Sequence, residues 1–121
     1  MIASYPDRTF RLWAYTVSHS TLLVRSVASP ANPHNIDVVF YDVGLLQLPT
    51  TLVELTISEE RGRSLEGPPE GSQHRTTYVL ESEGRTHIVE AAKCRVSQNT
   101  VDRFDGGPLW PFPGSLSPFD R

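Results

Sequence analysis

The chain has one cysteine and no long apolar run, and each shortage excludes a class of protein. Cys94 alone cannot form an intramolecular disulfide or a C-x-x-C metal site. No apolar run reaches the ~20 residues that a membrane-spanning helix needs, and no secretory signal follows the first residues. We therefore expect a cytoplasmic protein with no membrane partner.

Lysine is almost absent as well, because ten of the 11 basic residues are Arg and only Lys93 is Lys. The arginines are scattered along the chain, and the net charge is −3. Nucleic-acid-binding domains usually concentrate basic residues in a patch or stripe. The composition therefore predicts no nucleic-acid partner.

Motifs that carry chemistry are also missing. Neither a glycine-rich phosphate-binding loop nor a G-x-S-x-G element occurs, and no two histidines have the short spacing of metal ligands. The run Ser18-His19-Ser20 places a base between two hydroxyl groups, but it fits a hairpin loop as well as, or better than, a catalytic pair. We expect no metal and no cofactor, and we favour a non-enzymatic protein.

What the sequence does contain is alternation of apolar and polar residues with a period of two, which is typical of β-strands. It occurs in residues 9–17, 36–41, 52–57, 76–82 and 85–91, and residues 21–27 and 45–48 are predicted as two further strands. In the first segment the pattern places Phe10, Leu12 and Ala14 on one face. It places Arg11, Trp13 and Tyr15 on the other face.

The densest apolar stretch, residues 35–58, is predicted to form the centre of the core. Ile36, Val38 and Phe40 share a face there, and the run 42–44 interrupts the alternation. In the last part of the stretch, Val53, Leu55 and Ile57 are expected to point inward. A helix over residues 50–61 is the competing interpretation, but its β-branched residues favour a strand.

The remaining segments are expected to be an arm, loops and a tail. Residues 1–8 should form an extended arm, 58–75 a mobile polar loop, and Glu83-Gly84 a tight turn. Together, residues 1–100 make one β domain. Residues 101–121 are rich in Pro, Gly and aromatic residues, and disordered tails are usually poor in aromatics. We expect this tail to dock on the domain, on the face of Trp13 and Tyr15, or on a partner.

These patterns predict an all-β, predominantly antiparallel fold of six to eight strands. It would be a small sandwich or a partly open barrel with the C-terminal tail packed on it. The expected function is a protein-interaction module that binds a protein partner or self-associates as a homodimer. Its contact residues would be Trp13, Tyr15, Trp110, Phe112 and Phe119. The alternative is a small ligand-binding barrel or hydrolase with a pocket near Trp13, Tyr15, His19 and His87.

Overall fold

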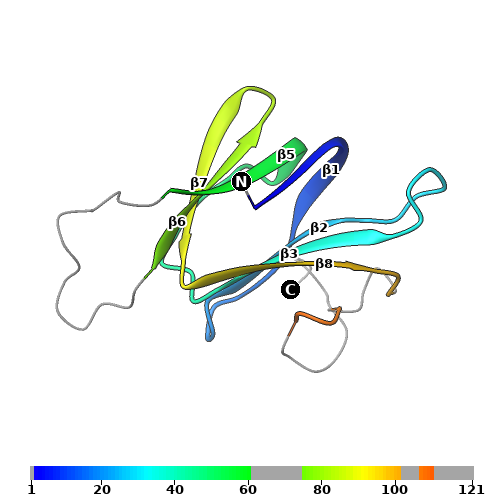
Figure 1. Ribbon diagram of the computed structural model, residues 1–121. Helices are drawn as coiled ribbons and strands as arrows, with labels where there is room; N and C mark the ends of the chain where they lie inside the picture. Colours follow the sequence, from blue (N-terminus) through cyan, green and yellow to red (C-terminus); the bar gives the residue numbers. More distant parts are fainter. Residues whose placement is uncertain (1, 61–74, 102–106, 111–121) are drawn as a thin grey trace, which may run out of the picture.

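The computed structural model describes residues 2–60, 75–101 and 107–110, and in these ranges it contains strands and no helix (Figure 1). The strands are β1 (Ala3–Thr16), β2 (Thr21–Ser26), β3 (Asn35–Tyr41), β4 (Leu45–Gln47), β5 (Thr51–Glu60), β6 (Thr76–Ser82), β7 (Arg85–Ala91) and β8 (Lys93–Asn99). All pairings are antiparallel. The predicted all-β antiparallel class is therefore confirmed, and residues 51–60 form β5 where a helix was the competing interpretation.

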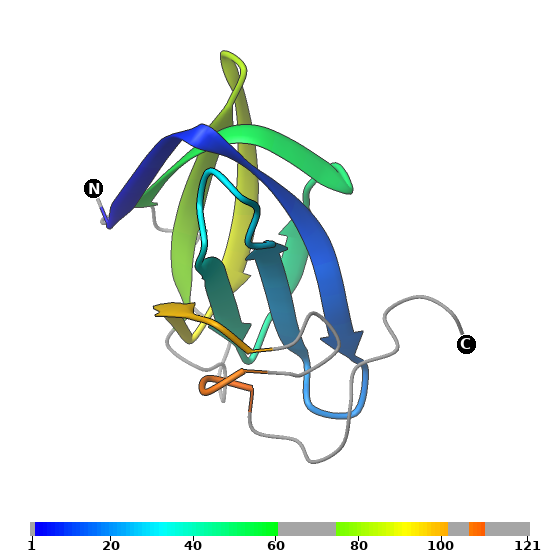
Figure 2. The same ribbon diagram turned by 90° about the vertical axis from the view of Figure 1, so that its right-hand side faces the viewer.

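The strands form one sheet in the order β4-β7-β6-β5-β1-β2-β3-β8. The two ends of this order are joined by the chain, because β4 follows β3 and β8 follows β7. The β3–β8 pair and the β4–β7 pair therefore meet at a bend. Two backbone hydrogen bonds continue the pairing across this bend, from Gly44 N–H to Glu90 C=O (2.7 Å) and from Ala92 N–H to Tyr41 C=O (2.9 Å). The sheet therefore curls into a partly open barrel, as the two views show (Figures 1 and 2).

The inside of the barrel is filled by an inner core to which β1–β3 and β5–β7 all contribute buried side chains. Ile36, Val38 and Phe40 lie in it, as the alternation predicts, and the Phe40 ring meets Tyr78 edge-on at 5.6 Å. The run 42–44 breaks the strand as expected, with Asp42 at a φ of 57°. The Glu83-Gly84 turn is also confirmed, with φ of 52° and 75° at its two residues.

A β-bulge in β1 changes the predicted faces of that strand. The pairing with β2 passes from Leu12↔Val24 directly to Ala14↔Leu23, so the register skips Trp13. An extra residue reverses the alternation beyond it. The prediction for Ala14 was therefore wrong, because Ala14 joins Leu23 outside the barrel.

The same bulge separates Trp13 from Tyr15. Tyr15 pairs with Leu22, which belongs to the inner core, while Trp13 packs against the cluster outside the barrel. Directly opposed residues of an antiparallel pair project to the same face. The predicted shared face of Trp13 and Tyr15 was therefore wrong, and the reason is again the extra residue.

A second irregularity, in β5, corrects the prediction for Val53. Glu54 has a φ of 62°, and the pairing of β1 with β5 shifts between Tyr5↔Leu55 and Thr9↔Val53. As a result Leu52 is fully buried and Val53 is 39% exposed, whereas Leu55 and Ile57 point inward as predicted.

Two predicted boundaries also move. The segment expected to be an arm is part of β1 from Ala3 onward, paired with β5. The segment expected to be a loop from residue 58 is still β5 as far as Glu60. In both places tertiary pairing extends a strand through residues whose local pattern is polar. Most of the predicted loop, residues 61–74, lies outside the described residues.

The β5 irregularity is tested by two neighbouring alanine substitutions. Leu52→Ala should lower the free energy of unfolding by about 2–5 kcal/mol, because it leaves a cavity in the inner core. Val53→Ala should lower it by less than about 1 kcal/mol, because that side chain faces solvent. Urea unfolding followed by circular dichroism measures both. A larger loss for Val53→Ala than for Leu52→Ala would contradict the assigned faces.

Candidate functional site

The outer surface of β2 and β3 is as buried as the inner surface. All six residues of β2 and the first six of β3 are buried. Strands covered on both faces are usually apolar throughout, but here the outer face carries charged residues as well. A second set of packed residues, which we call the outer cluster, covers this face. Its members are Trp13, Ala14, Leu23, Val39, Tyr41, Leu109 and Trp110.

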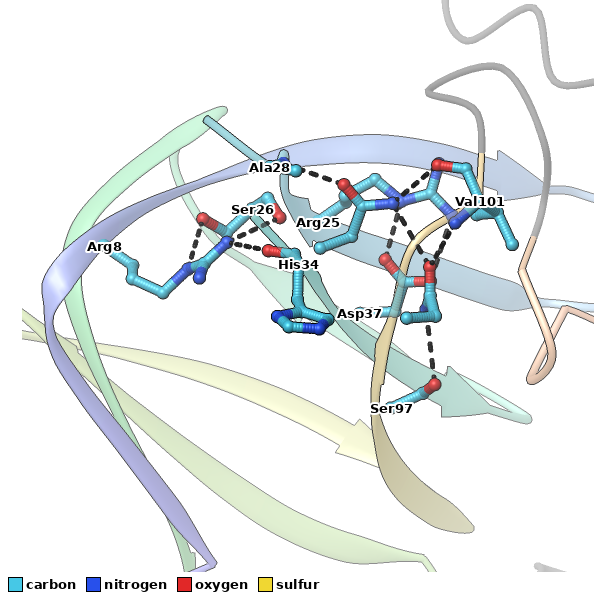
Figure 3. Close-up of polar contacts among 10 residues, drawn as sticks. Arg8, Arg25, Ser26, Ala28, His34, Asp37, Ser97 and Val101 are labelled. Carbon is cyan, nitrogen blue, oxygen red and sulfur yellow. Dashed lines mark hydrogen bonds and ion pairs between the residues drawn. The ribbon is translucent and has the colours of Figure 1, made fainter. Parts of the chain in front are cut away.

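The centre of the outer face is an ion pair between Arg25 of β2 and Asp37 of β3 (Figure 3). The contact is bidentate, with Nε donating to Oδ1 at 2.6 Å and Nη2 donating to Oδ2 at 3.0 Å. Both side chains are 0% exposed. The guanidinium carbon lies 6.0 Å from the centre of the Trp13 ring, at the outer limit of a cation–π contact.

Side-chain amides complete the hydrogen bonding around this pair. Asn99 of β8 donates to Asp37 Oδ2 at 2.9 Å, and Asn35 donates to Asn99 Oδ1 at 3.2 Å. Asn35 also donates to the carbonyl of Val101 and accepts a bond from the backbone of Ala28, which ties the end of β8 to the β2–β3 connection. Among the described residues, every buried side-chain nitrogen and oxygen has a hydrogen-bond partner. This matters because a buried charge left without partners is costly.

A second arginine links β1 to the same end of β2 and β3. Arg8 donates from Nε to the Ser26 hydroxyl at 3.0 Å, and from Nη2 to the carbonyls of Ser26 and His34 at 3.2 and 2.7 Å (Figure 3). Arg8 therefore fixes β1 against the connection between β2 and β3.

The C-terminal segment 107–110 lies on the outer cluster. Trp110 is 9% exposed, and the Tyr41 hydroxyl donates to the Leu109 carbonyl at 2.6 Å. Gly107 approaches the ion pair so closely that a Cβ added there would lie 2.5 Å from Asp37 Oδ2. The structure thus brings together Trp13 and Trp110, two of the predicted contact residues.

The other predicted contact residues are not part of this arrangement. Tyr15 is 39% exposed and lies on the opposite face of β1 from the outer cluster. Phe112 and Phe119 lie outside the described residues.

The two histidines of the alternative pocket are far apart. His19 lies in the exposed β1–β2 turn, where its Nδ1 is 3.0 Å from the Ser18 hydroxyl. His87 of β7 lines a recess of about 370 Å³ next to the β6–β7 hairpin. The two hairpins lie at opposite ends of the barrel (Figures 1 and 2).

The recess near His87 is mostly polar and contains no Trp13 or Tyr15. Its lining is Pro49, Thr51, Ser82, Glu83, Arg85 and His87. The Ser82 hydroxyl already donates to the Val53 carbonyl at 2.6 Å. Within residues 2–60, 75–101 and 107–110, no three His, Cys, Asp or Glu side chains gather in a group that could hold a metal ion.

Sequence reasoning missed the residues at the centre of the outer face: Arg25, Asp37, Asn99 and Gly107. A signal was present, because Arg25 and Asp37 each interrupt an otherwise apolar strand segment and have opposite charges. Charged residues are almost never fully buried unless they are paired. Two such interruptions in consecutive predicted strands therefore indicate a buried ion pair.

Cys94 is the other chemically distinct group. Burial, with a smaller contribution from the charge of Glu59, raises the pKa of its thiol from 9.0 to about 12. The thiolate is the reactive form of cysteine, so this environment suppresses nucleophilic chemistry at neutral pH.

Comparison with protein-family models, with curated proteins and with solved structures found no match to this chain. In the part of the chain that the structure describes, no helix is long and apolar enough to cross a membrane.

The ion pair can be tested by removing one charge and then both. Asp37→Asn should lower the free energy of unfolding by about 3–5 kcal/mol, because Arg25 stays buried without its counter-charge. The double variant Arg25→Met/Asp37→Leu should recover most of that loss, since apolar replacements of a buried ion pair are often neutral.

A matched control is Asp42→Asn, which removes the charge from the exposed ion pair of Asp42 with Arg75 (3.1 Å). It should change stability by less than about 1 kcal/mol. Urea unfolding measures all three variants. A loss for Asp37→Asn no larger than the control would contradict the role of the buried pair.

The raised pKa of Cys94 predicts that its thiol reacts slowly with a disulfide reagent in the folded protein. A shift from 9.0 to about 12 lowers the thiolate fraction roughly a thousandfold at pH 8. Ellman's reagent should therefore react far more slowly in buffer than in urea. Because the unfolded thiol loses its proton first, stability should also fall as the pH rises from about 9 towards 12. Equal labelling rates in buffer and urea would contradict this environment.

Proposed function

We propose that the protein is a non-enzymatic protein-interaction module that self-associates as a symmetric homodimer through β8. The observation that supports this proposal most is the edge of that strand. Among the described strands, β8 pairs only with β3 along seven residues. A sheet edge with free backbone groups is a template for pairing with another chain.

A β-bulge at the start of β8 determines which backbone groups of β8 point away from β3, to the side on which no described strand pairs with it. Ala92 N–H bonds the Tyr41 carbonyl, and the next residue, Lys93, is the ladder partner of Tyr41. Two residues therefore oppose one, as in a β-bulge. Beyond it, odd-numbered residues direct their N–H and C=O groups towards β3, and Val96 and Gln98 direct theirs to the open side.

The position of Cys94 agrees with this direction. Its backbone hydrogen-bonds the phenol group of Tyr78, which belongs to β6 and not to β3. The first even-numbered position of β8 is therefore already used inside the protein. Val96 and Gln98 are the next two positions along the same side.

A second copy of β8 fits this edge in an antiparallel register centred on Ser97. Val96 of one copy then pairs with Gln98 of the other, and each pair exchanges both backbone hydrogen bonds. On the outer face, Arg95 lies opposite Asn99 of the second copy, and Ser97 lies opposite its equivalent. No like charges oppose each other in this register, and like charges opposed across strands are destabilising.

A proline at residue 98 tests the dimer directly. Gln98→Pro removes a donor on the open side and leaves the bonds to β3 in place, because Gln98 is exposed and its N–H points away from β3. The matched control Gln98→Ala removes the side chain and keeps the donor. We expect multi-angle light scattering to give twice the chain mass for the wild type and Gln98→Ala, and a monomer for Gln98→Pro.

Circular dichroism should show the same fold for all three proteins. A wild-type monomer at high micromolar concentration would rule out self-association. A dimer that survives Gln98→Pro would show that β8 is not the contact. Either result would overturn the proposal in this form.

A further inference from the structure

The contact between Gly107 and the ion pair requires glycine for two independent reasons. Gly107 has a φ of +82°, a conformation that residues with a Cβ rarely adopt. A Cβ at this position would also lie 2.5 Å from Asp37 Oδ2 and 3.1 Å from Arg25 Nη2. These two atoms are held in a bidentate, fully buried ion pair, so they have little freedom to move aside.

Three positions later, the same segment places the ring of Trp110 in the outer cluster. The Trp110 side chain packs there with Ala14, Leu23 and Val39. The backbone N–H of Trp110 donates to the Gly107 carbonyl at 3.2 Å and closes a turn. The Tyr41 hydroxyl holds the intervening carbonyl of Leu109. The sheet therefore contacts a four-residue unit through a glycine, a carbonyl and a tryptophan.

The face that receives this unit is built by the barrel. Ala14 and Leu23 are brought together by the β1 bulge, Val39 and Tyr41 alternate along β3, and Arg25 and Asp37 are fixed by the amides of Asn99 and Asn35. Residue-specific contacts on a sheet face formed by other parts of the chain are what a peptide-binding site requires.

We infer that the outer face of β1–β3 is a recognition site for a Gly-x-x-Trp turn, occupied in this molecule by its own residues 107–110. The same turn supplied by another molecule binds there when the tethered one is displaced. Tethering gives the chain's own segment a high effective concentration, so a free peptide binds measurably only when the tethered turn is weakened. This site lies on the outer face and does not depend on pairing at the β8 edge.

The experiment uses the full chain with Trp110→Ala, which keeps the sheet face and removes the ring that fills it. The probe is a synthetic peptide of residues 105–112, DGGPLWPF, and isothermal titration calorimetry measures its binding. We expect saturable one-to-one binding to the variant and at least tenfold weaker binding to the wild type, whose site is occupied. The matched control peptide, with alanine in place of Gly107, should bind at least tenfold more weakly than the native peptide.

A second variant of the protein separates specific recognition from non-specific binding to an exposed apolar face. Adding Tyr41→Phe to the Trp110→Ala chain removes the hydroxyl that holds the Leu109 carbonyl, so it should weaken binding of the native peptide several-fold. If Trp110→Ala does not fold by circular dichroism, the same titrations are made on the full chain with Gly107→Ala. Absence of saturable binding to the folded variant, or equal binding of the glycine and alanine peptides, would overturn the inference.

Discussion

The buried Arg25–Asp37 ion pair is the constraint around which the outer half of this protein is arranged. Two charges removed from water are costly, and their attraction offsets that cost only when the geometry is good and the remaining hydrogen bonds are made. Both conditions are met here, by bidentate contact and by the amide of Asn99. Asn99 lies at the end of β8, so the requirement fixes β8 beside β3.

The same requirement explains why the outer face of β2 and β3 is covered. An ion pair open to water would tolerate sliding of its side chains, whereas a dry one has a single arrangement that satisfies all its partners. Gly107 closes over the pair at the distance that only a residue without a Cβ allows. The apolar residues on either side of this contact, including Trp13 and Trp110, then exclude solvent from it. The ion pair and the apolar outer cluster therefore lie on the same face of β2 and β3, and the cluster keeps water away from the ion pair.

Bulges decide which residues are available for these contacts. The bulge at Trp13 moves Ala14 to the outer face beside Leu23 and leaves Tyr15 on the other side. The bulge at Ala92 sets which backbone groups of β8 point towards β3 and which point to the open side. Side chains and backbone groups alternate along a strand with a period of two. One extra residue therefore reverses the side to which every following residue of that strand points.

The sequence alone determined the strand content and much of the core. Alternation placed Ile36, Val38 and Phe40 inside, and the Glu83-Gly84 turn and the break at Asp42 could be located from residue type. These features are local, because backbone preference and side-chain alternation depend on neighbours in the chain. The candidate site could be predicted only in part, through the aromatic residues Trp13 and Trp110.

Only the tertiary structure decided the faces beyond each bulge, the extension of β1 and β5, and the meeting of Arg25, Asp37, Asn99 and Gly107. These residues are separated by up to 82 positions in the chain, counted from Arg25 to Gly107. No local pattern indicates which strand pairs with which, because pairing is selected by the packing of the whole core. The position of an extra residue in a strand is likewise fixed by its partner strand. Alternation in the sequence alone therefore assigns Ala14 and Val53 to the wrong face.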